Sequence, residues 1–173
     1  MTNTFTSKLR EEGRAYENGA DRPLGSYLRV LGVYSGAVAG LVALGKLTGA
    51  RPPARISPMD LFLMGLTTHR LARTIAKDPV TSPFRAPFTR YAGVSGPAEL
   101  KEEVRGHGIK HAVGELLTCP FCLAQWVATA YAAGMVFAPG VTRLTGTTMS
   151  AVAIADWLQL AYARLMQATE EES

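Results

Sequence analysis

The sequence predicts an all-α integral membrane protein, a bundle of three to four short transmembrane helices with a proline-rich cytoplasmic loop. Of its 173 residues, 47% are hydrophobic and 18% charged, below the roughly one quarter of charged residues typical of soluble domains. The charges are also segregated, because they concentrate in residues 8–29 and 99–115 while long stretches elsewhere carry none. A soluble domain spreads charge over all its exposed faces, so this segregation favours a membrane protein.

The charge pattern divides the chain into three parts. We expect a polar N-terminal tail over residues 1–26, a helical membrane domain over 27–168 and a short acidic tail over 169–173. The net charge is +4, and the basic residues flank apolar stretches instead of forming one stripe. We therefore expect the lipid bilayer as a partner, and no nucleic acid.

The first apolar segment covers residues 30–45, between Arg29 and Lys46. A helix of this length rises about 24 Å, slightly short of a hydrocarbon core of about 30 Å. The flanking basic side chains can close the gap by extending toward the headgroups. This segment is a predicted transmembrane span.

Glycines recur at every fourth position of this first span, at Gly32, Gly36 and Gly40. Residues spaced by four share one helix face, and a face of small residues allows another helix to approach closely in lipid. The glycine face therefore predicts either tight packing within this chain or homo-oligomerisation through the same face.

A second helix is predicted to begin at Ser57, which can cap it, with Pro58 in the first turn and Asp60 at its positive end. Its apolar stretch, residues 61–68, is short. Basic side chains follow it at His69, Arg70, Arg73 and Lys77. The pattern is typical of a short span that emerges among headgroups, or of an interfacial helix. The basic face would anchor to anionic lipid or bind an anionic partner.

Prolines crowd residues 78–97, and their density predicts an ordered loop without helix or central strand. The following residues, 97–105, are predicted to form a short polar helix that ends at Gly106 and Gly108.

The strongest transmembrane signal is the uncharged run over residues 116–142. Pro120 should begin its helix, and Pro139 with Gly140 should end it. Positive charges divide unevenly between the two ends of a four-span bundle, with 14 on the side of both termini and the proline-rich loop and 4 on the other side. The positive-inside rule then predicts a multi-pass protein of the bacterial cell membrane with both termini in the cytoplasm.

A fourth apolar helix is predicted over residues 147–166, interrupted by Asp156. An acid inside a membrane helix either pairs with a base or serves an ion or proton path. Arg70 or Arg73 of the second helix could reach it.

Two cysteines, Cys119 and Cys122, flank the predicted start of the third span. Backbone N–H groups at a helix start stabilise thiolate, which suits thiol–disulfide chemistry and equally half of a zinc site. His107 and His111 lie upstream at a spacing that could complete four zinc ligands. The cysteines could also simply pack at the helix start. The predicted cytoplasmic side is reducing, which argues against a permanent disulfide.

The most specific motif of the chain is Gly114-Glu115-Leu116-Leu117-Thr118-Cys119-Pro120-Phe121-Cys122. Together with other motifs over about residues 57–140, it resembles one bacterial family, the domain of unknown function 1360. The resemblance implies membrane residence and no established reaction. It also singles out one set of residues: Arg73, Asp78, Arg85, Pro87, Glu115, Cys119, Cys122 and Trp126. His107 and His111 lie outside the motifs, although CxxC pairs from two chains could still form a Cys₄ site.

No sequence signature of an enzyme is present: no phosphate-binding glycine loop, no HExxH and no nucleophile elbow. The leading hypothesis is therefore a non-enzymatic membrane scaffold or assembly partner with an ordered cytoplasmic face. A thiol-redox or zinc protein that uses Cys119 and Cys122 is the alternative, and a small transporter that uses Asp156 ranks third.

Overall fold

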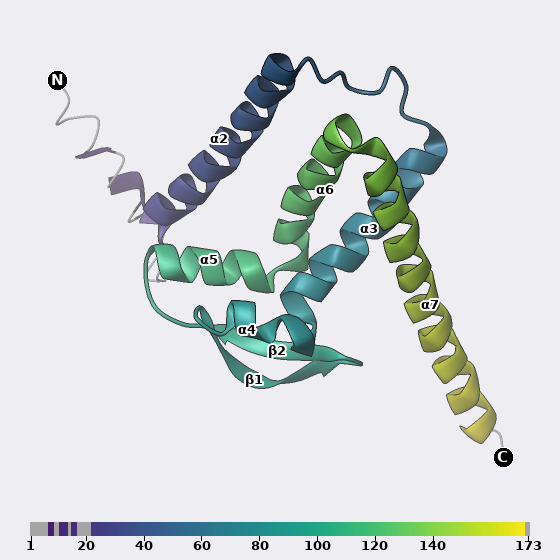
Figure 1. Cartoon of the computed structure of the whole chain (residues 1–173). Coiled ribbons are helices and arrows are strands. Elements are labelled where there is room, and N and C mark those ends of the chain that lie inside the picture. The colour runs from purple at the N-terminus through teal and green to yellow at the C-terminus, as the bar shows by residue number, and fades with distance from the viewer. Residues whose placement is uncertain (1–6, 9–10, 14, 17–21, 172–173) are drawn as a thin grey trace.

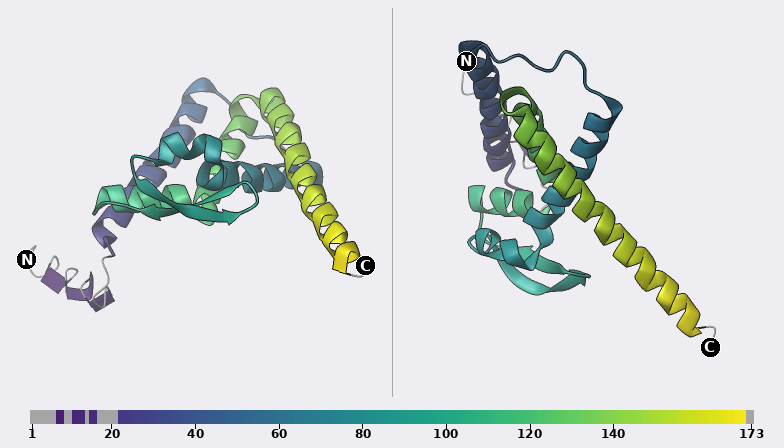
Figure 2. Two further views of the ribbon diagram at one scale, coloured as in Figure 1. Left: turned by 90° about the horizontal axis from the view of Figure 1, so that it is seen from below. Right: turned by 45° about the vertical axis from the view of Figure 1, so that its right-hand side comes forward.

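The computed structural model describes residues 7–8, 11–13, 15–16 and 22–171, and these are mostly helical. Helices α2 and α6 run from one end of the fold to the other, and α3 and α7 run back (Figure 1). A shorter helix, α5, lies with a β-hairpin across the end where α2 begins (Figure 2, left). The helix bounds are Leu24–Thr48 (α2), Pro58–Lys77 (α3), Ile109–Thr118 (α5), Pro120–Phe137 (α6) and Pro139–Glu171 (α7).

The predicted all-α class is wrong at the hairpin. Strands β1 (Thr89–Gly96) and β2 (Glu99–Val104) pair antiparallel, where a loop and then a polar helix were expected. Pro97 and Ala98 make the turn between them, and Ala98 has a φ of 56°, as the third position of a type II turn requires. Along β2, Leu100, Glu102 and Val104 are half-buried and Lys101 and Glu103 between them are exposed, while Glu99 at the start of the strand is also half-buried.

The proline-rich segment before the hairpin also contains helical turns that the prolines were expected to exclude. A 3₁₀ turn, η1 (Pro79–Thr81), leads into the short helix α4 (Ser82–Arg85). Pro79 and Pro83 lie in the first turns, where a helix has no need of the missing N–H. Pro87 lies outside both helix and strand.

The predicted start of α3 is confirmed. Ser57 and Asp60 form a reciprocal capping box, with Pro58 in the first turn. Arg143 of α7 donates to Asp60 at 2.9 Å. The Ser57 hydroxyl donates to the same carboxylate at 2.9 Å. The ion pair of Asp60 with Arg143 ties the start of α3 to α7.

Helix α3 packs between α6 and α7, and the small core lies where α3 meets α6 and α5. Ala72, Ala76 and Leu123 are its buried members, with Leu116 and Leu117 of α5 packed against them. Thr67 is fully buried and donates to the Gly146 carbonyl at 3.1 Å, which joins α3 to α7.

In the part of the chain that the structure describes, two helices, α2 and α6, are long and apolar enough to cross a membrane. These correspond to the first and third predicted spans. Helices α3 and α7 do not reach that hydropathy, so a bundle of three to four spans is not confirmed. Most of α2 is apolar yet exposed, for example at Leu28, Leu31 and Val33, a surface suited to lipid.

Helix α7 is longer than the predicted fourth helix, residues 147–166. It begins at Pro139, directly after α6, and continues to Glu171 into the acidic tail. Its last turns extend away from the other helices (Figure 2, right), and its residues from Trp157 to Glu170 are exposed.

Candidate functional site

Arg85 is the most completely buried charged side chain among the described residues, with 0% of its surface exposed. Its Nε donates to the carboxylate of Glu102 on β2. Its Nη1 donates to the Ile75 carbonyl at 2.7 Å and to Thr81 Oγ1 at 2.6 Å, and its Nη2 donates to the Asp78 carbonyl at 3.0 Å. One guanidinium thus joins the end of α3, η1 and the hairpin, using the fixed fork that only arginine offers.

Arg73 and Asp78 make contacts of the same kind nearby. Arg73 on α3 forms an ion pair with Glu99 at the start of β2. Asp78 Oδ1 accepts a hydrogen bond from the Val80 N–H at 2.9 Å and so caps η1. We call Arg73, Asp78, Arg85, Glu99 and Glu102 the hairpin clamp, because their bonds hold the hairpin and its approach segment against α3.

Three of the other motif residues, Glu115, Cys122 and Trp126, line a separate pocket between α2, α5 and α6. Glu115 of α5 forms an ion pair with Arg22 at 3.0 Å and accepts a hydrogen bond from the Tyr27 hydroxyl. Trp126 of α6 meets the ring of Tyr34 edge to face, with 5.1 Å between centroids. Glu115 and Trp126 line a pocket of about 440 Å³ together with Cys122. The motif residues therefore form two groups: Arg73, Asp78 and Arg85 lie apart at the hairpin, whereas Glu115 and Trp126 share the pocket with Cys122.

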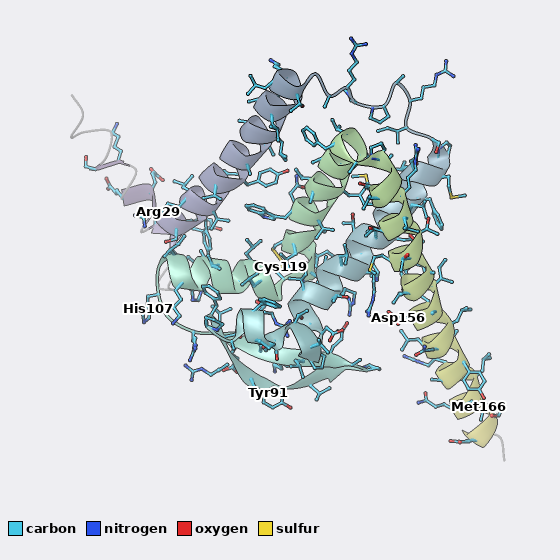
Figure 3. All side chains as sticks on the ribbon, in the orientation of Figure 1. Arg29, Tyr91, His107, Cys119, Asp156 and Met166 are labelled. Carbon is cyan, nitrogen blue, oxygen red and sulfur yellow. A yellow bond between two sulfur atoms is a disulfide. The ribbon has the colours of Figure 1, made fainter. Side chains whose placement is uncertain are left out.

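Cys119 and Cys122 lie at the corner between α5 and α6 (Figure 3). Cys119 is the N-cap of α6, as predicted, and its sulfur accepts a hydrogen bond from the Cys122 N–H at 3.1 Å. The two sulfurs lie together as a disulfide-like pair, whereas the predicted cytoplasmic setting had argued against a permanent disulfide. Cys122 is exposed.

The four-ligand zinc site is not formed in the structure. His107 lies beyond the far end of α5 from Cys119 (Figure 3), and His111 pairs with Glu115 at 3.4 Å. The described residues contain no group of three or more His, Cys, Asp or Glu side chains placed to hold a metal ion. The spacing in the sequence did not bring these four side chains together, because α5 separates the histidines from the cysteines.

Asp156 lies between α7 and α3 (Figure 3). It forms an ion pair with Arg70 at 3.0 Å, one of the two partners that the sequence predicted. The neighbouring Trp157 ring lies 5.7 Å from the His69 ring. The carboxylate therefore joins two helices, and this pairing leaves little support for a transporter that uses it.

The glycine face of α2 is not packed within the chain, so that interpretation is wrong. A Cβ added at Gly32, Gly36 or Gly40 would meet nothing within 4 Å. The face that meets the rest of the fold carries Tyr27 and Tyr34. At 100° per residue, Gly36 lies about 200° from Tyr34 and points the opposite way.

Three contributors to these sites were not singled out from the sequence: Glu99, Glu102 and Gly114. An added Cβ at Gly114 would lie 2.6 Å from Val104 Cγ1 and 3.1 Å from the Phe88 carbonyl oxygen. Gly114 therefore allows α5 to lie directly against the hairpin. The sequence offered one indication that Gly114 matters: it is the first residue of the most specific motif.

A sequence model of the family described as "Protein of unknown function (DUF1360)" matches residues 63–162. The chain belongs to this family. The matched region contains the hairpin clamp and both cysteines, and it leaves out α2 with its glycine face.

The chain is also similar to the sporulation protein YjcA of Bacillus subtilis (strain 168), with 30% identity over 76 residues. The match covers 42% of this chain and 64% of the relative, so it spans less than two thirds of that protein. No solved structure matches this chain.

Proposed function

We propose that this DUF1360 protein is a non-enzymatic membrane scaffold that presents its hairpin end as a rigid platform in the cytoplasm. One observation carries the proposal: the charged motif residues Arg73, Arg85 and Glu115 are each bonded to a distant part of the chain, and Asp78 caps the 3₁₀ turn η1. Charged side chains that are bonded within the chain hold helices and strands in position. A catalytic role would instead need groups available to a substrate.

Membrane residence is supported by the exposed apolar surface of α2 and by the length and hydropathy of α2 and α6. We propose that α3 and α7 complete the membrane domain, because α3 packs against both α6 and α7. The hairpin end has most of the basic residues, and the positive-inside rule places that end in the cytoplasm. The name of the relative YjcA suggests spore formation as the setting.

Assembly through the glycine face is the second part of the proposal, since that face is open and points away from the chain. Gly36→Leu should weaken self-association of the purified protein by at least about tenfold, or about 1.4 kcal/mol, because leucine keeps two helix backbones apart. Analytical ultracentrifugation in detergent measures the monomer–dimer equilibrium.

Ala37→Leu is the matched control for this test. It adds the same side chain one residue along α2, about 100° around the helix from the glycine face, and should leave self-association unchanged. Equal association of the wild type and Gly36→Leu would contradict assembly through this face.

A thiol-based function is the second candidate, because Cys119 and Cys122 lie together as a disulfide-like pair and Cys122 is exposed and lines the 440 Å³ pocket. Thiol titration before and after reduction, together with metal analysis of the purified protein, decides it. Cysteines that react with no thiol reagent after reduction, combined with the absence of bound metal, would exclude this candidate.

A further inference from the structure

The pocket beside Trp126 exists because α2 and α6 meet near one end and diverge toward the other. Near the C-terminal ends of both helices, an added Cβ at Gly45 would lie 3.8 Å from Phe137. Near the middle of each helix, the Tyr34 hydroxyl and Thr129 Oγ1 share a hydrogen bond of 2.8 Å. Toward the start of α2, helix α5 closes the space with Ala112 and Leu116. The volume, about 440 Å³, is within the range of roughly 300–1,000 Å³ usual for ligand pockets.

The chemistry of the lining favours a hydrocarbon ligand. Val30, Leu31 and Leu116 supply apolar surface. The polar groups are already bonded within the protein: the Tyr34 hydroxyl accepts a hydrogen bond from Gln125 Nε2 at 2.7 Å, and Glu115 accepts from Tyr27 and Arg22. A polar ligand would have to break these bonds, whereas a hydrocarbon chain needs no hydrogen-bond partner.

The position of the pocket indicates where such a chain would come from. The two long walls of the pocket are α2 and α6, the helices suited to cross a membrane. In a membrane, bilayer lipid would therefore surround these two helices. At the polar end of the pocket, beside the platform, the lining residue Glu115 pairs with Arg22, at the level proposed for the lipid headgroups. We infer that this pocket holds one acyl chain of a bilayer phospholipid, with its headgroup near Arg22. The inference rests on the membrane residence proposed above.

Val30→Phe tests the inference, because Val30 is half-buried and lines the pocket. The full-length protein is purified in mild detergent supplemented with palmitoyl-oleoyl phosphatidylglycerol and measured by native mass spectrometry. We expect one retained phospholipid on the wild type and loss of that adduct in Val30→Phe, since the larger ring occupies the space of the chain.

Val33→Phe is the matched control: it makes the same substitution one turn along α2, at a residue that is 64% exposed, and it should retain the lipid. Leu31→Phe, at the more exposed rim of the pocket, replaces Val30→Phe if that variant does not fold. The inference is overturned if the wild type retains no lipid, if a folded pocket variant retains as much as the control, or if the adduct has the mass of a free fatty acid. A protein that needs no detergent to stay in solution would overturn the membrane proposal as well.

Discussion

Arg85→Ala should destabilise the protein by about 3–5 kcal/mol, the effect expected when one partner of a buried ion pair is removed. The pair is buried on both sides, with 0% of the Arg85 side chain and 6% of the Glu102 side chain exposed. The substitution leaves the Glu102 carboxylate and the carbonyls of Ile75 and Asp78 without this donor. Unfolding in detergent, followed by circular dichroism, measures the loss. Hydrogen exchange should show faster exchange across residues 89–104.

Two variants make the Arg85 result specific. Arg90→Ala removes an exposed arginine from the neighbouring strand and should change stability by no more than about 0.5 kcal/mol. Arg85→Lys keeps the charge but lacks the planar fork, so it should recover only part of the loss. If Arg85→Ala is as stable as Arg90→Ala, the clamp does not hold the hairpin.

Gly114→Ala should destabilise the protein by about 1–3 kcal/mol, the usual effect of overpacking. The new methyl group would overlap Val104 and press on the Phe88 carbonyl, which accepts a hydrogen bond from the Arg105 N–H at 2.9 Å. Helix α5 and the hairpin must then separate. The same denaturation experiment measures the change.

Gly65→Ala is the matched control for Gly114, because Gly65 lies within α3 and an added Cβ there meets nothing within 4 Å. Because alanine has a higher helix propensity than glycine, Gly65→Ala should stabilise the protein by up to about 1 kcal/mol. The two substitutions should therefore change stability in opposite directions. A Gly114→Ala protein as stable as the wild type would show that α5 does not depend on this close approach.

The starts of α3 and α6 could be predicted from the sequence because their signals are local. Ser57 and Asp60 cap α3, and Cys119 caps α6, through contacts with residues three positions away. The pairing of Asp156 with Arg70 or Arg73 was also predictable, since a carboxylate in an apolar helix needs a base.

The hairpin could not be predicted because its evidence is tertiary. Glu102 faces inward although it is polar, because it pairs with Arg85. The sequence of β2 therefore lacks the alternation of apolar and polar residues that is typical of a half-buried strand. Its turn uses Ala98 at a positive φ, where the usual signal would be glycine. The direction of the glycine face was equally undetermined, because spacing shows which residues share a face and not what that face meets.

Cysteine labelling tests the membrane-anchored platform most directly. In a Cys119→Ser, Cys122→Ser background, Ser95→Cys reports on the hairpin and Ala54→Cys on the loop at the opposite end, both at exposed positions. We expect a membrane-impermeant maleimide to label Ala54→Cys in intact bacterial cells and Ser95→Cys only after lysis. Labelling of Ser95→Cys from outside, or equal labelling of both positions, would contradict a cytoplasmic platform held by membrane helices.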